Sequence, residues 1–165
     1  MNAARGLLTM LFLYTIPLYA QVNVPSQDRP KELGQSVFGL GLSGGLVSGI
    51  GLSFRHHLPS VLSYQVVGGI IKVDTKLHYD VGTEIQFDLT RGESTRFFAC
   101  GGIGYFFSGE SGNNELDGPL RMGIGIGGEV MRVESFSFSG ELMFSYFSDG
   151  TVLPLPQVGA HYYFY

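Results

Sequence analysis

The sequence is poor in several kinds of residue that soluble proteins use freely. It has no tryptophan, a single cysteine (Cys100), and only 15% charged residues in a chain of 165. Soluble domains carry about 25% charged residues, so a soluble fold of this composition would have a sticky surface. One cysteine excludes an internal disulfide, and we expect Cys100 to be a small buried thiol. The formal net charge of −4 gives no support to nucleic-acid binding.

Long apolar runs are also missing, except at the start of the chain. Arg5 supplies a positive charge, residues 7–18 are apolar, and Ala20 is a small residue. This order predicts a secretory signal peptide, residues 1–20, cleaved after Ala20. The alternative is an uncleaved anchor helix, but the run is shorter than the roughly 20 residues that a span needs. Residues 21–35 are polar and are expected to form a short periplasmic lead-in to one domain, residues 36–165.

From residue 36 onward, apolar and polar residues alternate, which is typical of β-strands. The clearest case is residues 77–89, where Leu77, Val81 and Ile85 share one face and Asp80 and Glu84 the other. Eight strands are expected, at residues 37–43, 47–55, 61–73, 77–89, 96–107, 120–131, 136–147 and 157–165. This even number of strands, all joinable as hairpins, predicts an all-β fold, an eight-stranded antiparallel up-and-down transmembrane β-barrel.

The expected connections alternate in length, as they do in outer-membrane barrels. Residues 57–60, 91–94 and 133–135 would form short turns on the periplasmic side, and residues 108–118 and 148–156 longer loops outside. Two further outer connections, near residues 44–46 and 74–76, are short and weaken this pattern.

Alternation alone does not decide which face of the barrel is outside, and a soluble barrel of the lipocalin kind would turn the apolar face inward. Two observations favour the membrane barrel. The polar positions are rich in glycine and serine, which suit a narrow packed lumen better than a face in water. Aromatic residues of the apolar face gather toward the strand ends, as in interfacial girdles. These residues are Tyr64, Phe97 and Phe136 near one rim and Tyr79, Tyr105 and Tyr146 near the other.

The last strand carries a motif of its own. Gln157, Gly159, Tyr162 and Phe164 follow the order polar, x, Gly, x, x, apolar, x, apolar, which resembles the C-terminal assembly signal of Gram-negative outer-membrane barrels. Tyr165 departs from that signal by extending one residue beyond it. As a whole, the chain resembles the small barrels of the OmpA/OmpX type. The resemblance implies an outer-membrane location, contact with outer-membrane lipids, delivery by periplasmic chaperones and the barrel-assembly machinery, and a monomer without a cofactor.

Charged residues at inward positions are the other informative feature. A charge in a narrow lumen must be paired, hydrogen-bonded or hydrated. The two interpretations are an ion-pair core that fills the barrel and a narrow path that prefers cations, and the sequence does not assign the pairs. The expected lumen charge cluster consists of Arg55, Asp80, Glu84, Asp88, Arg96, Arg121, Glu129 and Glu141.

The sequence contains only weak matches to cofactor-binding and catalytic motifs. Two GxGxxG matches, at residues 39–44 and 123–128, lack the following helix that a dinucleotide site needs, so we interpret them as lumen glycines. No His-x-Ser pair of the kind found in lipid A deacylases occurs, and the histidines do not suggest a metal site. We therefore predict a structural or surface-interaction protein without catalytic chemistry. The alternatives are a narrow small-solute or cation channel and a lipid-modifying enzyme.

Overall fold

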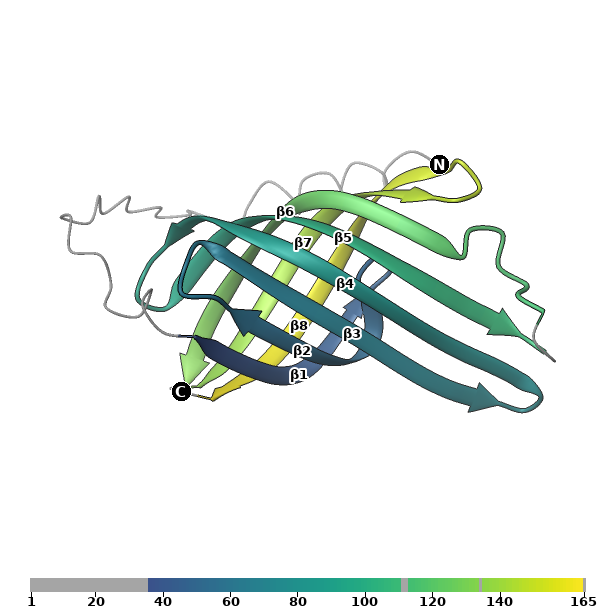
Figure 1. Ribbon diagram of the computed structural model, residues 1–165, viewed down its shortest axis with the longest axis horizontal. Helices are drawn as coiled ribbons and strands as arrows, with labels where there is room; N and C mark the ends of the chain where they lie inside the picture. Colours follow the sequence, from purple (N-terminus) through teal and green to yellow (C-terminus); the bar gives the residue numbers. More distant parts are fainter. Residues whose placement is uncertain (1–35, 111–112, 134, 165) are drawn as a thin grey trace, which may run out of the picture.

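The computed structural model describes residues 36–110, 113–133 and 135–164, which form one closed barrel of antiparallel strands (Figure 1). The predicted fold is confirmed, since each strand pairs with its sequence neighbours and β8 pairs with β1 to close the ring. The predicted signal peptide, the lead-in and Tyr165 lie outside the described residues. The strands are β1 (Val37–Gly45), β2 (Gly49–His57), β3 (Leu62–Val73), β4 (Lys76–Arg91), β5 (Thr95–Gly109), β6 (Leu120–Val133), β7 (Phe136–Phe147) and β8 (Val152–Phe164).

The two faces of the barrel wall have opposite chemistry. Large apolar side chains point outward and are exposed, for example Leu52 at 76%, Ile70 at 73% and Ile124 at 72%. The buried side chains are mostly polar, and Glu84, Gln86 and their inward neighbours fill the interior. A protein in water buries its large apolar side chains, so this barrel has the arrangement expected in lipid and not that of a lipocalin. In the described part of the chain, no helix is long and apolar enough to cross a membrane.

The barrel has two unlike ends. We call the end that carries Val37 and Phe164 the terminal end, and the opposite end, where β1 joins β2 and β7 joins β8, the loop end. At the terminal end, β4 and β5 are joined by residues 92–94 alone. At the loop end, the longest connection joins β5 to β6. Short turns on one side and a long loop on the other agree with the expected pattern.

The final loop is shorter than the sequence predicted. We expected residues 148–156 to be irregular, but β8 begins at Val152 and pairs with β7 from Tyr146 onward. Pro154 and Pro156 lie within β8, although proline cannot donate a ladder hydrogen bond. The structure tolerates them because β1 pairs with β8 only as far as Val158, which leaves the prolines on an edge without a second neighbour.

Candidate functional site in the barrel lumen

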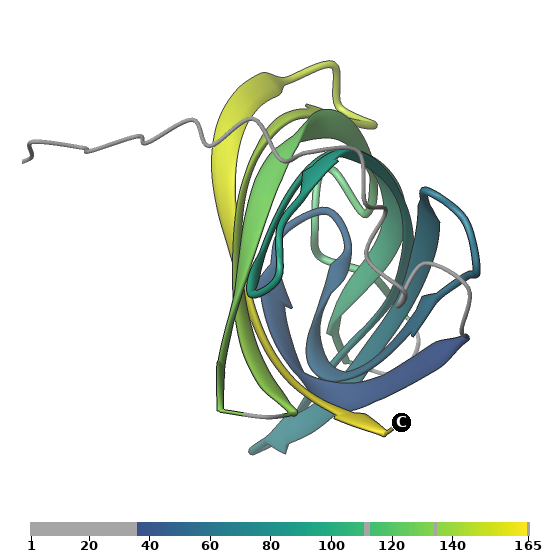
Figure 2. The same ribbon diagram turned by 90° about the vertical axis from the view of Figure 1, so that its left-hand side faces the viewer.

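The most unusual feature of the barrel is the turn between its two shortest strands. Residues 46–48 join β1 to β2 and bend inward, so that the tip of this hairpin lies inside the ring of strands (Figure 2). Val47 is 0% exposed and Ser48 is 1% exposed. Val47 packs in the lumen against Phe98, Cys100 and Met143. We call residues 46–48 the inserted turn. The sequence analysis had placed Val47 at the start of a strand, and that placement is wrong.

Glycines on the surrounding strands make room for the inserted turn. A Cβ added at Gly104 would lie 2.1 Å from the Val47 carbonyl oxygen, and one at Gly82 would lie 2.3 Å from the Ser48 carbonyl oxygen. Gly49, which follows the turn, has a φ of 113°, a conformation that suits glycine. These inward glycines therefore leave the space that the inserted turn occupies.

Replacing Gly104 with alanine should displace the inserted turn, because the new Cβ overlaps the backbone of Val47. We expect the free energy of unfolding to fall by about 1–3 kcal/mol, the usual cost of overpacking. Gly140→Ala is the control, since no atom lies within 4 Å of a Cβ at that position. Urea titration of both barrels in vesicles measures the effect. Equal stability of the two variants would contradict the inward placement of the turn.

Gln157 on β8, the strand that pairs with β1, holds the inserted turn. Its Oε1 accepts hydrogen bonds from the backbone N–H groups of Val47 (3.3 Å) and Ser48 (3.0 Å). Its Nε2 donates to the carboxylates of Glu84 (3.3 Å) and Glu141 (3.0 Å). The Ser48 hydroxyl donates to Glu84 as well. Gln157 thus joins the turn to a pair of buried acids, a contact that the sequence motif had not suggested.

A second group of charges lies between that pair and the terminal end, around Glu129. Arg96 donates to Glu129 Oε2 through Nε (3.0 Å) and NH2 (2.7 Å), and Arg55 NH1 lies 3.3 Å from the same oxygen. The hydroxyls of Tyr163 (2.5 Å) and Ser137 (2.6 Å) donate to Glu129 Oε1. Both oxygens of this carboxylate therefore have partners in a buried site, where Glu129 is 6% exposed. We call these five residues the Glu129 cluster.

The Glu129 cluster is connected to further lumen charges on both sides. Arg96 also pairs with Asp88 (2.9 Å), and Asp88 pairs with Arg91 (2.7 Å). Toward the lumen centre, Arg55 lies 3.6 Å from Glu141. A cavity of about 80 Å³ opens at the terminal end and is lined by Arg91, Arg96 and Glu129 among others. The lining of the cavity thus includes Arg96, Glu129 and Tyr163 of the Glu129 cluster.

The structure brings six of the eight expected lumen charges into this chain of contacts. They are Arg55, Glu84, Asp88, Arg96, Glu129 and Glu141. The other two lie at the loop end and form no salt bridge with a described residue. Asp80 accepts a hydrogen bond from the Ile50 N–H (2.6 Å). Arg121 lies over the ring of Phe106, 4.0 Å from its centroid, and donates to two backbone carbonyls.

Two serine–histidine pairs in the lumen have the residue types of a nucleophile and its base. Ser53 and His161, 2.8 Å apart, are both almost fully buried. Ser63 Oγ and His57 Nδ1 lie 2.6 Å apart, and His57 Nε2 lies 2.8 Å from the Tyr163 hydroxyl. However, Ser63 is 1% exposed and also accepts a hydrogen bond from Arg96 (3.1 Å). A nucleophile must reach its substrate, so this geometry fits a structural network better than acyl transfer.

The loop end is tied together by polar contacts between hairpins. Lys76, at the start of β4, pairs with Glu115 of the β5–β6 connection (2.6 Å), and Thr75 donates to Glu110. In the β7–β8 turn, the Thr151 N–H donates to Asp149 and lowers the pKa of that carboxyl below its usual value. Figure 1 shows the β3–β4 hairpin extending well beyond the inserted turn. These hairpins therefore form the protruding surface of the molecule.

Comparisons with known proteins agree with the architecture. No protein-family model matches the sequence, and no curated protein matches it. Among solved structures, the N-terminal β-barrel domain of Pseudomonas aeruginosa OprF matches with a TM-score of 0.54 and 12% identity, over 78% of this chain and 96% of that one. The fold is that of the small outer-membrane barrels. At this identity, the likeness to the OprF barrel concerns the fold alone.

The outer-membrane protein Ail of Yersinia pestis matches more loosely. Its crystal structure gives a TM-score of 0.48 at 15% identity, and its structure in a phospholipid nanodisc gives 0.45 at 16%. Both alignments cover 79% of this chain and 99% of Ail. The fold therefore rests on the likeness to the OprF domain, and the role of the protein must be argued from the lumen and the loops.

Proposed function

We propose that the protein is a closed outer-membrane barrel that anchors and displays its loop-end hairpins, without catalytic chemistry and without a conducting pore. The single observation that carries this proposal is the inserted turn. Val47 and Ser48 are buried in the lumen and are held there by Gln157. Below them, the Glu129 cluster fills the barrel toward the terminal end. Together these groups favour the ion-pair core over the cation path.

The same proposal places each end of the barrel on one side of the outer membrane. The apolar outer wall would contact outer-membrane lipids, with the terminal end in the periplasm and the loop end outside the cell. Gln157, Gly159, Tyr162 and Phe164 would form the signal read by the assembly machinery after the chain leaves its periplasmic chaperones. The contacts of Lys76 with Glu115 and of Thr75 with Glu110 hold neighbouring loop-end hairpins together, which supports a defined surface for display. A barrel closed by its own strands needs no second copy, so we propose a monomer.

Planar-bilayer recording tests the closed lumen. The wild-type barrel should give no stable conductance steps, and neither should Glu84→Gln, which removes one buried charge. A porin reconstituted in the same bilayer is the positive control. Cation-selective steps in the wild type that change in Glu84→Gln would contradict the proposal and would instead support a channel through the lumen.

A further inference from the structure

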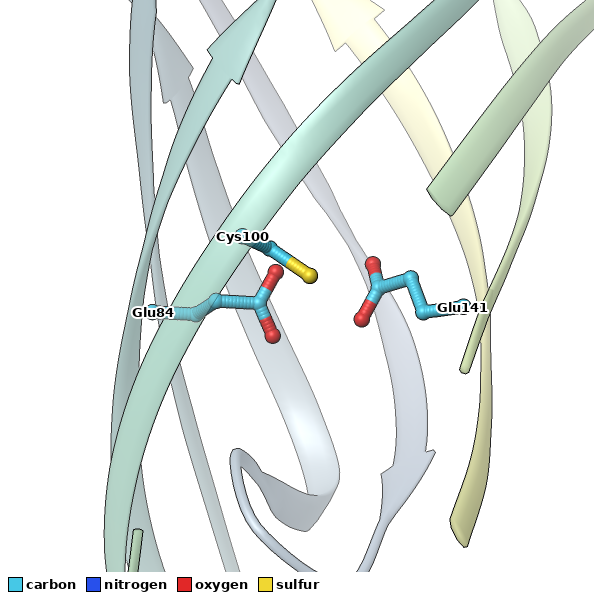
Figure 3. A group of neighbouring side chains, drawn as sticks. All are labelled: Glu84, Cys100 and Glu141. Atoms are coloured by element: carbon cyan, nitrogen blue, oxygen red, sulfur yellow. The ribbon is translucent and has the colours of Figure 1, made fainter. Parts of the chain in front are cut away.

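Three chemically reactive side chains point toward one another in the centre of the lumen. Glu84 on β4 and Cys100 on β5 come from neighbouring strands, and Glu141 on β7 approaches them from across the barrel (Figure 3). A carboxylate oxygen of each glutamate and the Cys100 sulfur all lie within 4.8 Å of one another. Glu84 is 0% exposed and Cys100 is 7% exposed. We call these residues the central triad.

The charge of the central triad is not balanced by the described residues. Glu129 and Asp88 each pair with two arginines, whereas Glu141 has only Arg55, which it shares with Glu129. Glu84 forms no salt bridge within the described part of the chain. The groups that donate to it are uncharged, namely the hydroxyl of Ser48 and the amides of Gln86 and Gln157. Its carboxyl group also lies against that of Glu141. Two buried acids in contact are costly unless a proton or a cation neutralises them.

The Cys100 thiol is the second observation that points to a ligand. Its sulfur forms no hydrogen bond with a described residue, although the side chain is more than nine-tenths buried. The thiol points toward the space between the two carboxylates (Figure 3). Two carboxylates alone would suit hard cations such as Mg²⁺ or Ca²⁺. A thiolate beside them shifts the preference toward zinc and similar borderline metals.

We propose that the central triad binds one divalent cation of the zinc class, through one oxygen each of Glu84 and Glu141 and the sulfur of Cys100. Binding would release the thiol proton to solvent. The two carboxylates and the thiolate then carry three negative charges, which the metal ion and Arg55 neutralise. Because the inserted turn lies over the site, the metal ion would enter as the barrel folds and would then exchange slowly.

Metal retention tests the site. The full chain is folded into phosphatidylcholine vesicles with Cd²⁺ or Zn²⁺ present, free metal is removed with a chelator, and bound metal is measured by mass spectrometry. We expect about one metal ion per chain, with a thiolate-to-cadmium absorption band for Cd²⁺. Cys100→Ala and Glu84→Gln should each lower retention at least about tenfold. Glu115→Gln, which changes an exposed acid at the loop end, should retain the metal fully.

Other results would overturn the site. If the wild type retains no metal, a proton and not a cation neutralises the two acids. If Cys100→Ala and Glu84→Gln retain as much as the wild type, the metal is bound elsewhere. Gel migration before and after heating shows whether each variant has folded. Cys100→Ser, which has nearly the volume of cysteine, replaces Cys100→Ala if the latter does not fold, and it should lose the cadmium absorption band.

Discussion

Replacing Glu129 with alanine should lower the free energy of unfolding by about 3–5 kcal/mol, the usual cost of removing one partner from a buried charge pair. Glu129 is 6% exposed, its two oxygens accept hydrogen bonds from Arg96, Ser137 and Tyr163, and it forms a salt bridge with Arg55. Without it, both arginines remain in the lumen, and only Asp88 and Glu141 are left to pair with them. Equilibrium unfolding in urea, with the barrel in vesicles, measures the loss.

The matched control for Glu129→Ala is Glu115→Ala. Glu115 also pairs with a cation, Lys76 at 2.6 Å, but both side chains are nearly half exposed. An exposed pair contributes about 0–1 kcal/mol, so this variant should differ little from the wild type. If Glu129→Ala is no less stable than Glu115→Ala, the lumen charges are solvated and the Glu129 cluster does not hold the barrel together.

Replacing Phe164 with aspartate should leave secretion intact and remove most of the folded barrel from the membrane. The Phe164 side chain is 50% exposed on the outer wall at the terminal end. A charge near the membrane interface costs only about 0–1 kcal/mol in stability. A large loss of folded protein would therefore come from failed recognition of the assembly signal. Membrane fractionation and heat-modifiable gel migration measure the folded amount.

Phe38→Asp separates recognition from stability. Phe38 lies on β1, directly opposite Phe164 in the strand register, and is similarly exposed at 43%. Both substitutions thus place a carboxylate at the same depth on the same face. Only Phe164→Asp changes the proposed assembly signal, so Phe38→Asp should assemble. Equal losses for the two variants would show that the last strand carries no special signal.

The strands and their faces could be predicted because period two is a strong signal in this chain. In β4, the alternation of Val81 and Ile85 with Glu84 and Gln86 sets both the strand and the side facing the lumen. Register could not be predicted, because it depends on which residues face each other across strands. Arg55, Glu129 and Glu141 could therefore be predicted to be lumen charges, but their ion-pair partners could not.

The inserted turn escaped prediction for a specific reason. Val47 and Ser48 break the alternation of β2, because the apolar Val47 has the parity of Gly49 and the polar Ser48 has that of Ile50. One mismatched pair at the end of an expected strand is a weak signal, and the strand was placed from Val47 onward despite it. A second signal was present on other strands. Gly82, Gly102 and Gly104 all lie on inward positions, which leaves a volume that some other segment must fill. Asp80 and Arg121 were assigned to the lumen charge cluster because they alternate with outward apolar residues. Alternation shows which face of the strand a residue is on, but not how far along the barrel axis it lies.

Nitroxide labels on the outer wall test the central claim, a barrel with its apolar face in lipid and its polar face closed inside. Labels at Ile124 (72% exposed) and Leu142 (48% exposed) should be relaxed strongly by oxygen, which dissolves in lipid, and weakly by a water-soluble nickel complex. A label at Ser139, which is 6% exposed in the lumen, should be reached poorly by both reagents. If the nickel complex relaxes the Ile124 and Leu142 labels more than oxygen does, the apolar face lies in water and the membrane-barrel account is wrong.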